Sequence, residues 1–196
     1  MRVLVLSLLA GCLGSKAAPL DVRYFSPEAP TARAPARPGV AVPAPQMARL
    51  RLGRVSPSAN LRYDIVHRES TFEVAPYETR RWTEQPDAYV RRSLAHALFD
   101  ARPLQRAVGG AAPTLEIEVI AFEEVSTTSR HTGRVQLGYQ LSDEQSVLAS
   151  GVVTAEHEVR GAGFDAVVAA IAAAMEDVTA QVGDLVVRQL GREQQR

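Results

Sequence analysis

In the second half of the chain, two stretches show a period of two and a third strand pattern follows them, and this arrangement constrains the fold more than any other feature. They cover residues 115–122, 134–141 and 147–159. A period of two is typical of a β-strand with one buried face. The polar residues 142–146 between the last two stretches indicate a tight connection. The sequence therefore predicts a three-stranded antiparallel meander.

Helical patterns precede and follow this meander. Pro86 occupies a favoured first position of a helix, and Asp87 adds negative charge at its positive end. A second, alanine-rich helix is expected over about residues 164–190. Shorter strand patterns come before Pro86, at residues 50–52, 63–68 and 71–74. We therefore predict an α+β fold, a two-layer sandwich in which a mainly antiparallel sheet is packed by two helices.

The only cysteine of the chain ends a short apolar run. Arg2 precedes residues 3–9, which are apolar apart from Ser7, and the small residues Ala10 and Gly11 come just before Cys12. This is the layout of an export signal, and a cysteine at the cut makes it a bacterial lipobox. We predict a signal peptide at residues 1–11 and a lipid anchor on Cys12, with acyl chains such as palmitate. The alternative is a buried N-terminal strand with an incidental cysteine.

Residues 26–46 contain six prolines among alanines. Proline fixes φ and lacks a backbone donor, so neither a helix nor a strand ladder continues through such a stretch. We predict that residues 12–46 form the lipid anchor and a semi-rigid tether, and that residues 47–196 form one folded domain.

Charge is balanced, with 22 Lys and Arg against 22 Asp and Glu. The arginines are spread among the acidic residues and form no basic block, which argues against a nucleic-acid partner.

The residues that an enzyme or a metal centre needs do not come together in the sequence. His67, His96, His131 and His157 are isolated from one another, without metal-ligand spacing. The sequence has no phosphate-binding glycine loop and no nucleophile elbow. Adjacent glutamates, as in 123–124, point to opposite faces of a strand. We therefore predict no catalytic, cofactor-binding or metal-binding residues and no enzymatic activity, although a pair of distant carboxylates stays open as an alternative.

Aromatic residues are the candidates for a partner interface. Tyr24 and Phe25 stand apart from the predicted domain and need something to pack on, namely a sheet edge, a partner or a membrane interface. Arg81 and Trp82 lead into the first helix, where the tryptophan either caps the core or marks an interface. Phe122 either closes one end of the sheet or contributes to a contact surface.

In their order along the chain, these features resemble the auxiliary lipoproteins of ABC-type lipid transport systems, the family that includes the PqiC membrane-integrity lipoproteins. The matching motifs are Leu9-Ala10-Gly11-Cys12, the aromatic strand 23–26, the strands 50–55 and 61–68, Tyr77, Arg81-Trp82, residues 118–123 and the final helix at 164–190.

The resemblance implies a non-catalytic periplasmic domain that is anchored by its lipid to the periplasmic face of the outer membrane. It implies an MCE-domain protein and its inner-membrane ABC transporter as partners, lipid as the transported class, and assembly into homo-oligomeric rings. Leu13 after the cysteine, rather than aspartate, agrees with the usual outer-membrane sorting rule. The principal alternative is a structural outer-membrane assembly lipoprotein. An envelope hydrolase and a direct lipid carrier are weaker alternatives, because the sequence shows neither a Ser-His-Asp set nor the pattern of a large cavity.

Overall fold

The computed structural model describes residues 20–28 and 48–193. Its strands are β1 (Arg23–Phe25), β2 (Ala48–Pro57), β3 (Asp64–Arg68), β4 (Val74–Trp82), β5 (Leu104–Arg106), β6 (Thr114–Ser126), β7 (His131–Ser142) and β8 (Val147–Glu158). The helices are α1 (Pro86–Ala95), which continues into the π-helical turn η1 (His96–Asp100), and α2 (Phe164–Glu193). Cys12 and the predicted signal peptide lie outside the described residues.

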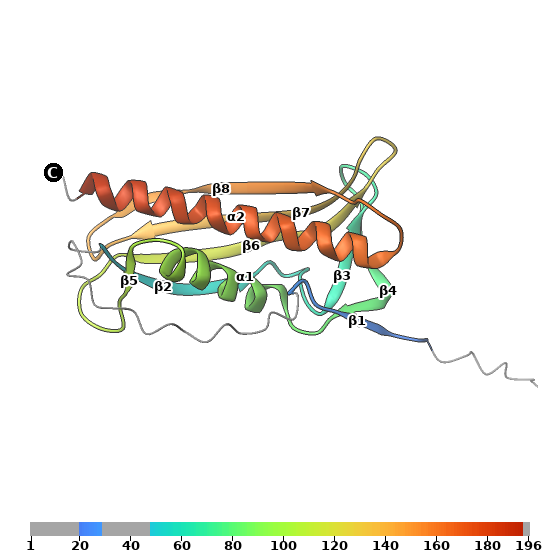
Figure 1. The fold of residues 1–196 in the computed structure, drawn as a ribbon, viewed down its shortest axis with the longest axis horizontal. Helices are drawn as coiled ribbons and strands as arrows, with labels where there is room; N and C mark the ends of the chain where they lie inside the picture. Colours follow the sequence, from blue (N-terminus) through green and yellow to red (C-terminus); the bar gives the residue numbers. More distant parts are fainter. Residues whose placement is uncertain (1–19, 29–47, 194–196) are drawn as a thin grey trace, which may run out of the picture.

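All eight strands belong to one open sheet in which β6 is the central strand (Figure 1). One edge of β6 pairs with β7, and β7 pairs with β8. The other edge is shared by two strands in succession: β2 pairs with residues 114–119 of β6, and β3 pairs with residues 123–125. The sheet then continues from β2 to β5 and from β3 through β4 to β1.

The meander is confirmed, and the sheet, which the sequence predicts to be mainly antiparallel, is a mixed one. The pairs β6–β7, β7–β8 and β3–β4 are antiparallel, whereas β1–β4, β2–β5, β2–β6 and β3–β6 are parallel. Parallel pairs need long crossover connections. Here the chain passes through β3, β4 and α1 before β6 returns beside β2. The prediction of an α+β fold is confirmed, and the antiparallel direction holds for the meander and for the pair of β3 and β4.

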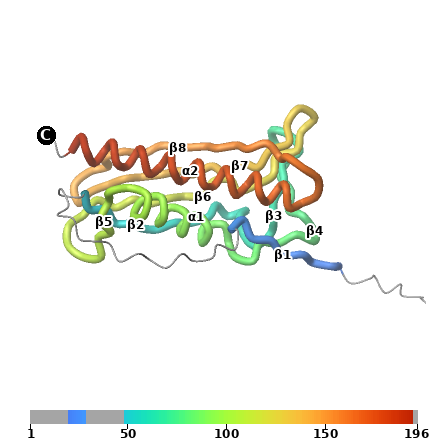
Figure 2. The backbone as a smooth tube through the Cα atoms, in the orientation of Figure 1, coloured from blue at the N-terminus to red at the C-terminus, as the bar shows by residue number. Residues whose placement is uncertain are grey.

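Both helices lie on the same side of the sheet in Figure 1, and the tube in Figure 2 follows the same path. α2 packs mainly on β7 and β8, while α1 packs on β2 and on α2. By length and composition alone α2 could cross a membrane, but 56% of its most apolar stretch is buried in the fold. Its apolar residues are explained by the core that it covers.

A glycine in β7 lets α2 approach the sheet closely. A Cβ added at Gly133 would lie 2.3 Å from the backbone nitrogen of Ile171. The core between helices and sheet includes the fully buried Trp82, Tyr89 and Phe122, together with Leu94, Leu98, Leu115, Leu137, Leu141 and Ile171.

Two predicted boundaries change in the structure. β1 lies within the range 12–46 that is predicted to be anchor and tether, yet it pairs with β4, so the folded domain includes residues 23–25. The strand predicted at 71–74 begins only at Val74 and continues through Pro76 to Trp82 as β4. Beside Pro76, β4 is an outer strand of the sheet, because β1 pairs only with residues 80–82. A proline without a donor is tolerated in such a position.

Candidate functional site

The predicted interface residues meet where β1 pairs with β4 at one end of the sheet. Arg23, Tyr24 and Phe25 lie opposite Arg80, Arg81 and Trp82, respectively. Directly opposed residues of neighbouring strands point to the same face. The pair of Tyr24 and Arg81 therefore shares one face, and the pair of Phe25 and Trp82 shares the face that carries the helices.

The helix-side pair belongs to the core. Phe25 is 9% exposed, and its ring contacts the edge of Phe164 with 4.8 Å between centroids. Trp82 and Phe122 have no exposed surface and pack edge-to-face at 5.3 Å, with Tyr89 beside both. Trp82 and Phe122 therefore close the core beside α1, and neither is accessible to a partner in this structure.

Arg81 uses its donors within the domain. Its Nε lies 2.7 Å from an Asp64 carboxylate oxygen, and its terminal nitrogens donate to the backbone carbonyls of Tyr77, Glu78 and Arg80. These carbonyls lie where the pairing of β3 and β4 shifts register. Arg81 therefore holds an irregular stretch of β4 in place. Of the five predicted interface residues, Tyr24 alone is widely exposed, at 66%.

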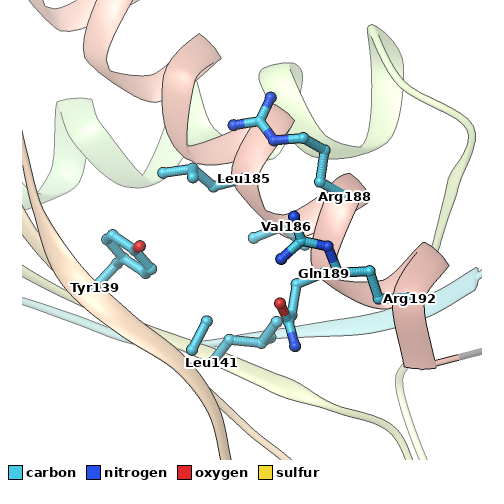
Figure 3. Close-up of a pocket in the computed structure, with 8 residues that line it drawn as sticks. Tyr139, Leu141, Leu185, Val186, Arg188, Gln189 and Arg192 are labelled. Atoms are coloured by element: carbon cyan, nitrogen blue, oxygen red, sulfur yellow. The ribbon is translucent and has the colours of Figure 1, made fainter.

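A small hollow lies near the C-terminal end of α2, between this helix and strands β7 and β8 (Figure 3). We call it the α2 hollow, and its volume is about 200 Å³. Its lining residues are Tyr139, Leu141, Ala149, Leu185, Val186, Arg188, Gln189 and Arg192. Within residues 20–28 and 48–193, the side chains of Arg188 and Arg192 make no hydrogen bond or ion pair. Two guanidinium groups beside apolar side chains suit a ligand in which a small anionic group is attached to an apolar part.

A second, wider hollow lies on the opposite face of the sheet and has a volume of about 430 Å³. It is lined by Arg54, Ser56, Glu116, Ile117, Glu118, Gly138, Tyr139, Gln140, Ser150, Gly151 and Val152. Gly138, which brings no side chain to this face, forms part of its lining. Neither hollow was predicted from the sequence. The one available signal was the spacing of Arg188 and Arg192, four residues apart on the expected last helix.

Two adjacent glutamates of β6 are buried on opposite faces, as their spacing predicts. Glu123 accepts bonds from Arg68, at 2.9 Å, and from Arg134. Glu124 lies on the helix side, where it accepts a hydrogen bond from the Tyr77 hydroxyl and lies 2.6 Å from His131 Nε2. Burial raises the pKa of Tyr77 above its ordinary value, and the hydrogen bond to Glu124 raises it further. A phenol held protonated in this way is a hydrogen-bond donor rather than a base.

The four histidines each find a carboxylate that the sequence analysis did not assign. His67 pairs with Glu69, His96 with Asp100, His131 with Glu124 and His157 with Asp177. Among the residues that the structure describes, no group of three or more His, Cys, Asp and Glu side chains is placed to hold a metal ion. The pair of His131 and Glu124 connects β7 to β6 and that of His157 and Asp177 connects β8 to α2, whereas the other two pairs are local.

The fold resembles several solved structures. The protein XCC0632 from Xanthomonas campestris matches with a TM-score of 0.70 and 20% identity, over 89% of this chain and 100% of that one. An uncharacterized protein matches with a TM-score of 0.62 and 17% identity, over 71% and 92% of the two chains. The hypothetical protein CT253 from Chlamydia trachomatis matches with a TM-score of 0.51 and 8% identity, over 74% and 96%. At these identities the likeness shows the fold alone.

The sequence itself identifies the family. No curated protein matches it. The model of the ABC-type transport auxiliary lipoprotein component family matches residues 29–183, which include every strand and helix from β2 to most of α2. The chain therefore belongs to the family of ABC-type transport auxiliary lipoprotein components.

Proposed function

We propose that this protein is an outer-membrane lipoprotein, acylated on Cys12, that serves as a non-catalytic auxiliary component of an MCE/ABC-type intermembrane lipid transport system. The observation that carries the proposal is the family match over residues 29–183. The lipobox at residues 9–12 and Leu13 after the cysteine support the anchor and its membrane. The domain then faces the periplasm and contacts an MCE-domain protein that leads to the inner-membrane transporter.

The described surface offers features that suit an adaptor. β8 has twelve residues and, in the described part of the chain, pairs with β7 alone. An unpaired strand edge of this length is a template for pairing with another chain. We therefore include assembly of several copies into a ring in the proposal, with β8 as the edge that joins them. A strictly monomeric lipidated protein in detergent contradicts this part of the proposal.

The location is tested by separating inner and outer membranes on a density gradient. We expect the native chain in the outer-membrane fraction and Cys12→Ala in the soluble periplasmic fraction, because only the cysteine thiol receives the lipid. The matched variant Leu13→Asp keeps the acylated cysteine and is expected to move to the inner-membrane fraction. If Cys12→Ala fractionates like the native chain, the lipid anchor is refuted.

The transport role is tested by affinity capture of the lipidated protein from envelope membranes after mild crosslinking. We expect an MCE-domain protein and its ABC permease among the captured proteins. Capture of a β-barrel assembly complex without an MCE-domain protein supports the alternative of a structural assembly lipoprotein and overturns the transport proposal.

A further inference from the structure

The residues that lead into β1 expose apolar side chains. Leu20, Val22 and Tyr24 alternate with Asp21 and Arg23, and their exposed fractions are 66%, 37% and 66%. Such alternation is the pattern of one face of an extended segment. We call Leu20, Val22 and Tyr24 the β1 stripe. Exposed apolar side chains gathered in one segment indicate a surface that is covered in the functional state.

The proline-rich residues do not separate this stripe from the lipid anchor. Phe25 pairs with Trp82 through β1, and Glu28 binds Arg92 of α1 at 2.8 and 3.0 Å. The chain has therefore already joined the folded domain before residues 29–47, and it continues in β2 directly after them. Both ends of that segment are attached to the same domain. Its length consequently does not determine how far the domain stands from the membrane.

The true spacer between the lipid and the domain is short. Leu20 follows Cys12 by eight residue steps (20 minus 12). Fully extended, they reach at most about 28 Å, and a flexible chain of this length spans about 15 Å on average. α2 has 30 residues, which corresponds to a length of about 45 Å, and it runs along the long axis of the molecule (Figure 1). The anchor therefore keeps the end of the domain that carries β1 much closer to the bilayer than the opposite end.

The side chains of the β1 stripe suit a lipid surface. Tyrosine is enriched at membrane interfaces, where its ring lies among the acyl chains and its hydroxyl reaches the headgroups. The acyl chains attach the protein to the bilayer at one point only, so a second, apolar contact adds binding energy and sets how the domain lies on the bilayer. Arg23 lies on the other face of the strand from the β1 stripe, with its guanidinium carbon 5.3 Å from the centroid of the Phe25 ring.

We infer that the β1 stripe docks on the phospholipid bilayer in which the lipid anchor is embedded. The domain then stands on the membrane at its β1 end. The end that carries the α2 hollow and the start of β8 points into the periplasm, toward the transport machinery. This inference rests on the acylation of Cys12 in the proposed function, and it adds a membrane-contacting surface and an orientation.

The test uses the full lipidated chain in vesicles of phosphatidylethanolamine and phosphatidylglycerol that contain spin-labelled phospholipid. A fluorescent probe is attached at Asp21→Cys, which leaves the β1 stripe intact. The matched control carries the probe at Val147→Cys, a 57% exposed position at the start of β8, at the opposite end of the molecule (Figure 1). In both chains the Cys12 thiol carries lipid, so the probe reacts with the introduced thiol only. Since the vesicles contain no other protein, quenching reports contact with lipid.

We expect several-fold stronger quenching at position 21 than at position 147, and loss of this quenching when Leu20→Ser and Tyr24→Ser are added. Both residues are exposed, so circular dichroism is expected to show an unchanged fold. A glycine-serine insertion within residues 29–46 is expected to leave both signals unchanged, because both ends of that segment belong to the domain.

Three results overturn the inference. Absence of quenching at position 21 excludes membrane contact, and equal quenching at both positions excludes the orientation. Quenching at position 21 that persists in the double serine variant shows that the acyl anchor alone brings this end near the lipid. Mass spectrometry of the same samples reports acylation of Cys12. A failure of the proposed anchor is thereby distinguished from a failure of the docking surface.

Discussion

The two halves of β6 differ in what covers them. In residues 115–119, beside β2, buried and exposed side chains alternate, and the face away from the helices is open to solvent. In residues 121–125, beside β3, every residue is buried, including Glu123 and Glu124. The same strand therefore has one solvent-facing surface in its first half and none in its second half.

The difference follows from the partners of each half. In the second half, Arg68 from β3 and Arg134 from β7 cover Glu123 on the face away from the helices, and α2 lies directly on Gly133 on the other face. In the first half, Glu116 and Glu118 remain exposed on the face away from the helices, and the two hollows described above lie against this part of the sheet. We call the first half of β6 the open half and the second half the closed half. The closed half is the one whose neighbour β3 leads on to β4 and β1, so the end proposed to stand on the membrane is also the more closely packed one.

The largest expected effect of the difference between the two halves of β6 is at the two glycines of β7. Gly133→Ala places a Cβ 2.3 Å from the backbone of α2, which has no flexible end that can give way. We expect the free energy of unfolding to fall by about 3 kcal/mol or more, at the upper end for overpacked sites. In Gly138→Ala the new Cβ meets the Cδ1 of Ile120 at 3.3 Å, so a change of less than about 1 kcal/mol is expected. Urea denaturation of both variants measures the difference, and equal losses refute the contrast between the halves.

A second, smaller contrast concerns two glutamates on the same face of β6. Glu123→Gln leaves the charges of Arg68 and Arg134 without a counter-ion, so we expect a loss of about 2 kcal/mol in the free energy of unfolding. This is less than for a fully buried pair, because these arginine side chains remain 22% and 23% exposed. Glu118→Gln alters one exposed hydrogen bond to Ser58, at 3.0 Å, and is expected to cost less than about 0.5 kcal/mol.

Urea denaturation at neutral pH compares these two variants. A loss for Glu118→Gln as large as that for Glu123→Gln contradicts the view that the second half of β6 is closed by its ion network.

The sequence predicts the open half of the sheet better than the closed half. Alternation in residues 115–119 and in β7 is a local signal, and it places the meander correctly. Residues 121–125 do not alternate because both of their faces are covered, and those covers come from β3 and α2, which are distant in the chain. The parallel pairing of β1 with β4 is likewise non-local, since Tyr24 and Arg81 are 57 residues apart (81 minus 24) and β1 has three residues.

The candidate site shows the same limit. Adjacency alone predicts that Glu123 and Glu124 point to opposite faces, and their partners confirm it. Whether Trp82 is core or interface depends on α1 and β6 packing over it, which no local pattern contains. The proline-rich residues 26–46 look like a tether in sequence because proline prevents helix and strand. Their role as a connection within the domain follows only once β1 is seen in the sheet.

A third effect, smaller than those of Gly133→Ala and Glu123→Gln, is expected at Tyr77, on the helix side of the closed half. Tyr77→Phe removes the hydroxyl that donates to the buried Glu124 and is expected to cost about 1 kcal/mol at neutral pH. Burial and the Glu124 carboxylate raise the pKa of Tyr77 in the folded protein, so above about pH 10 the unfolded chain loses this proton first, and the free energy of unfolding falls as pH rises. Tyr77→Phe abolishes this part of the alkaline loss, whereas Tyr24→Phe, at a widely exposed position, retains it. Urea denaturation at a series of alkaline pH values measures how steeply the free energy of unfolding falls with pH. If the free energy of unfolding of Tyr77→Phe falls with pH as steeply as that of the native chain, the buried hydroxyl is not a cause of the alkaline loss of stability.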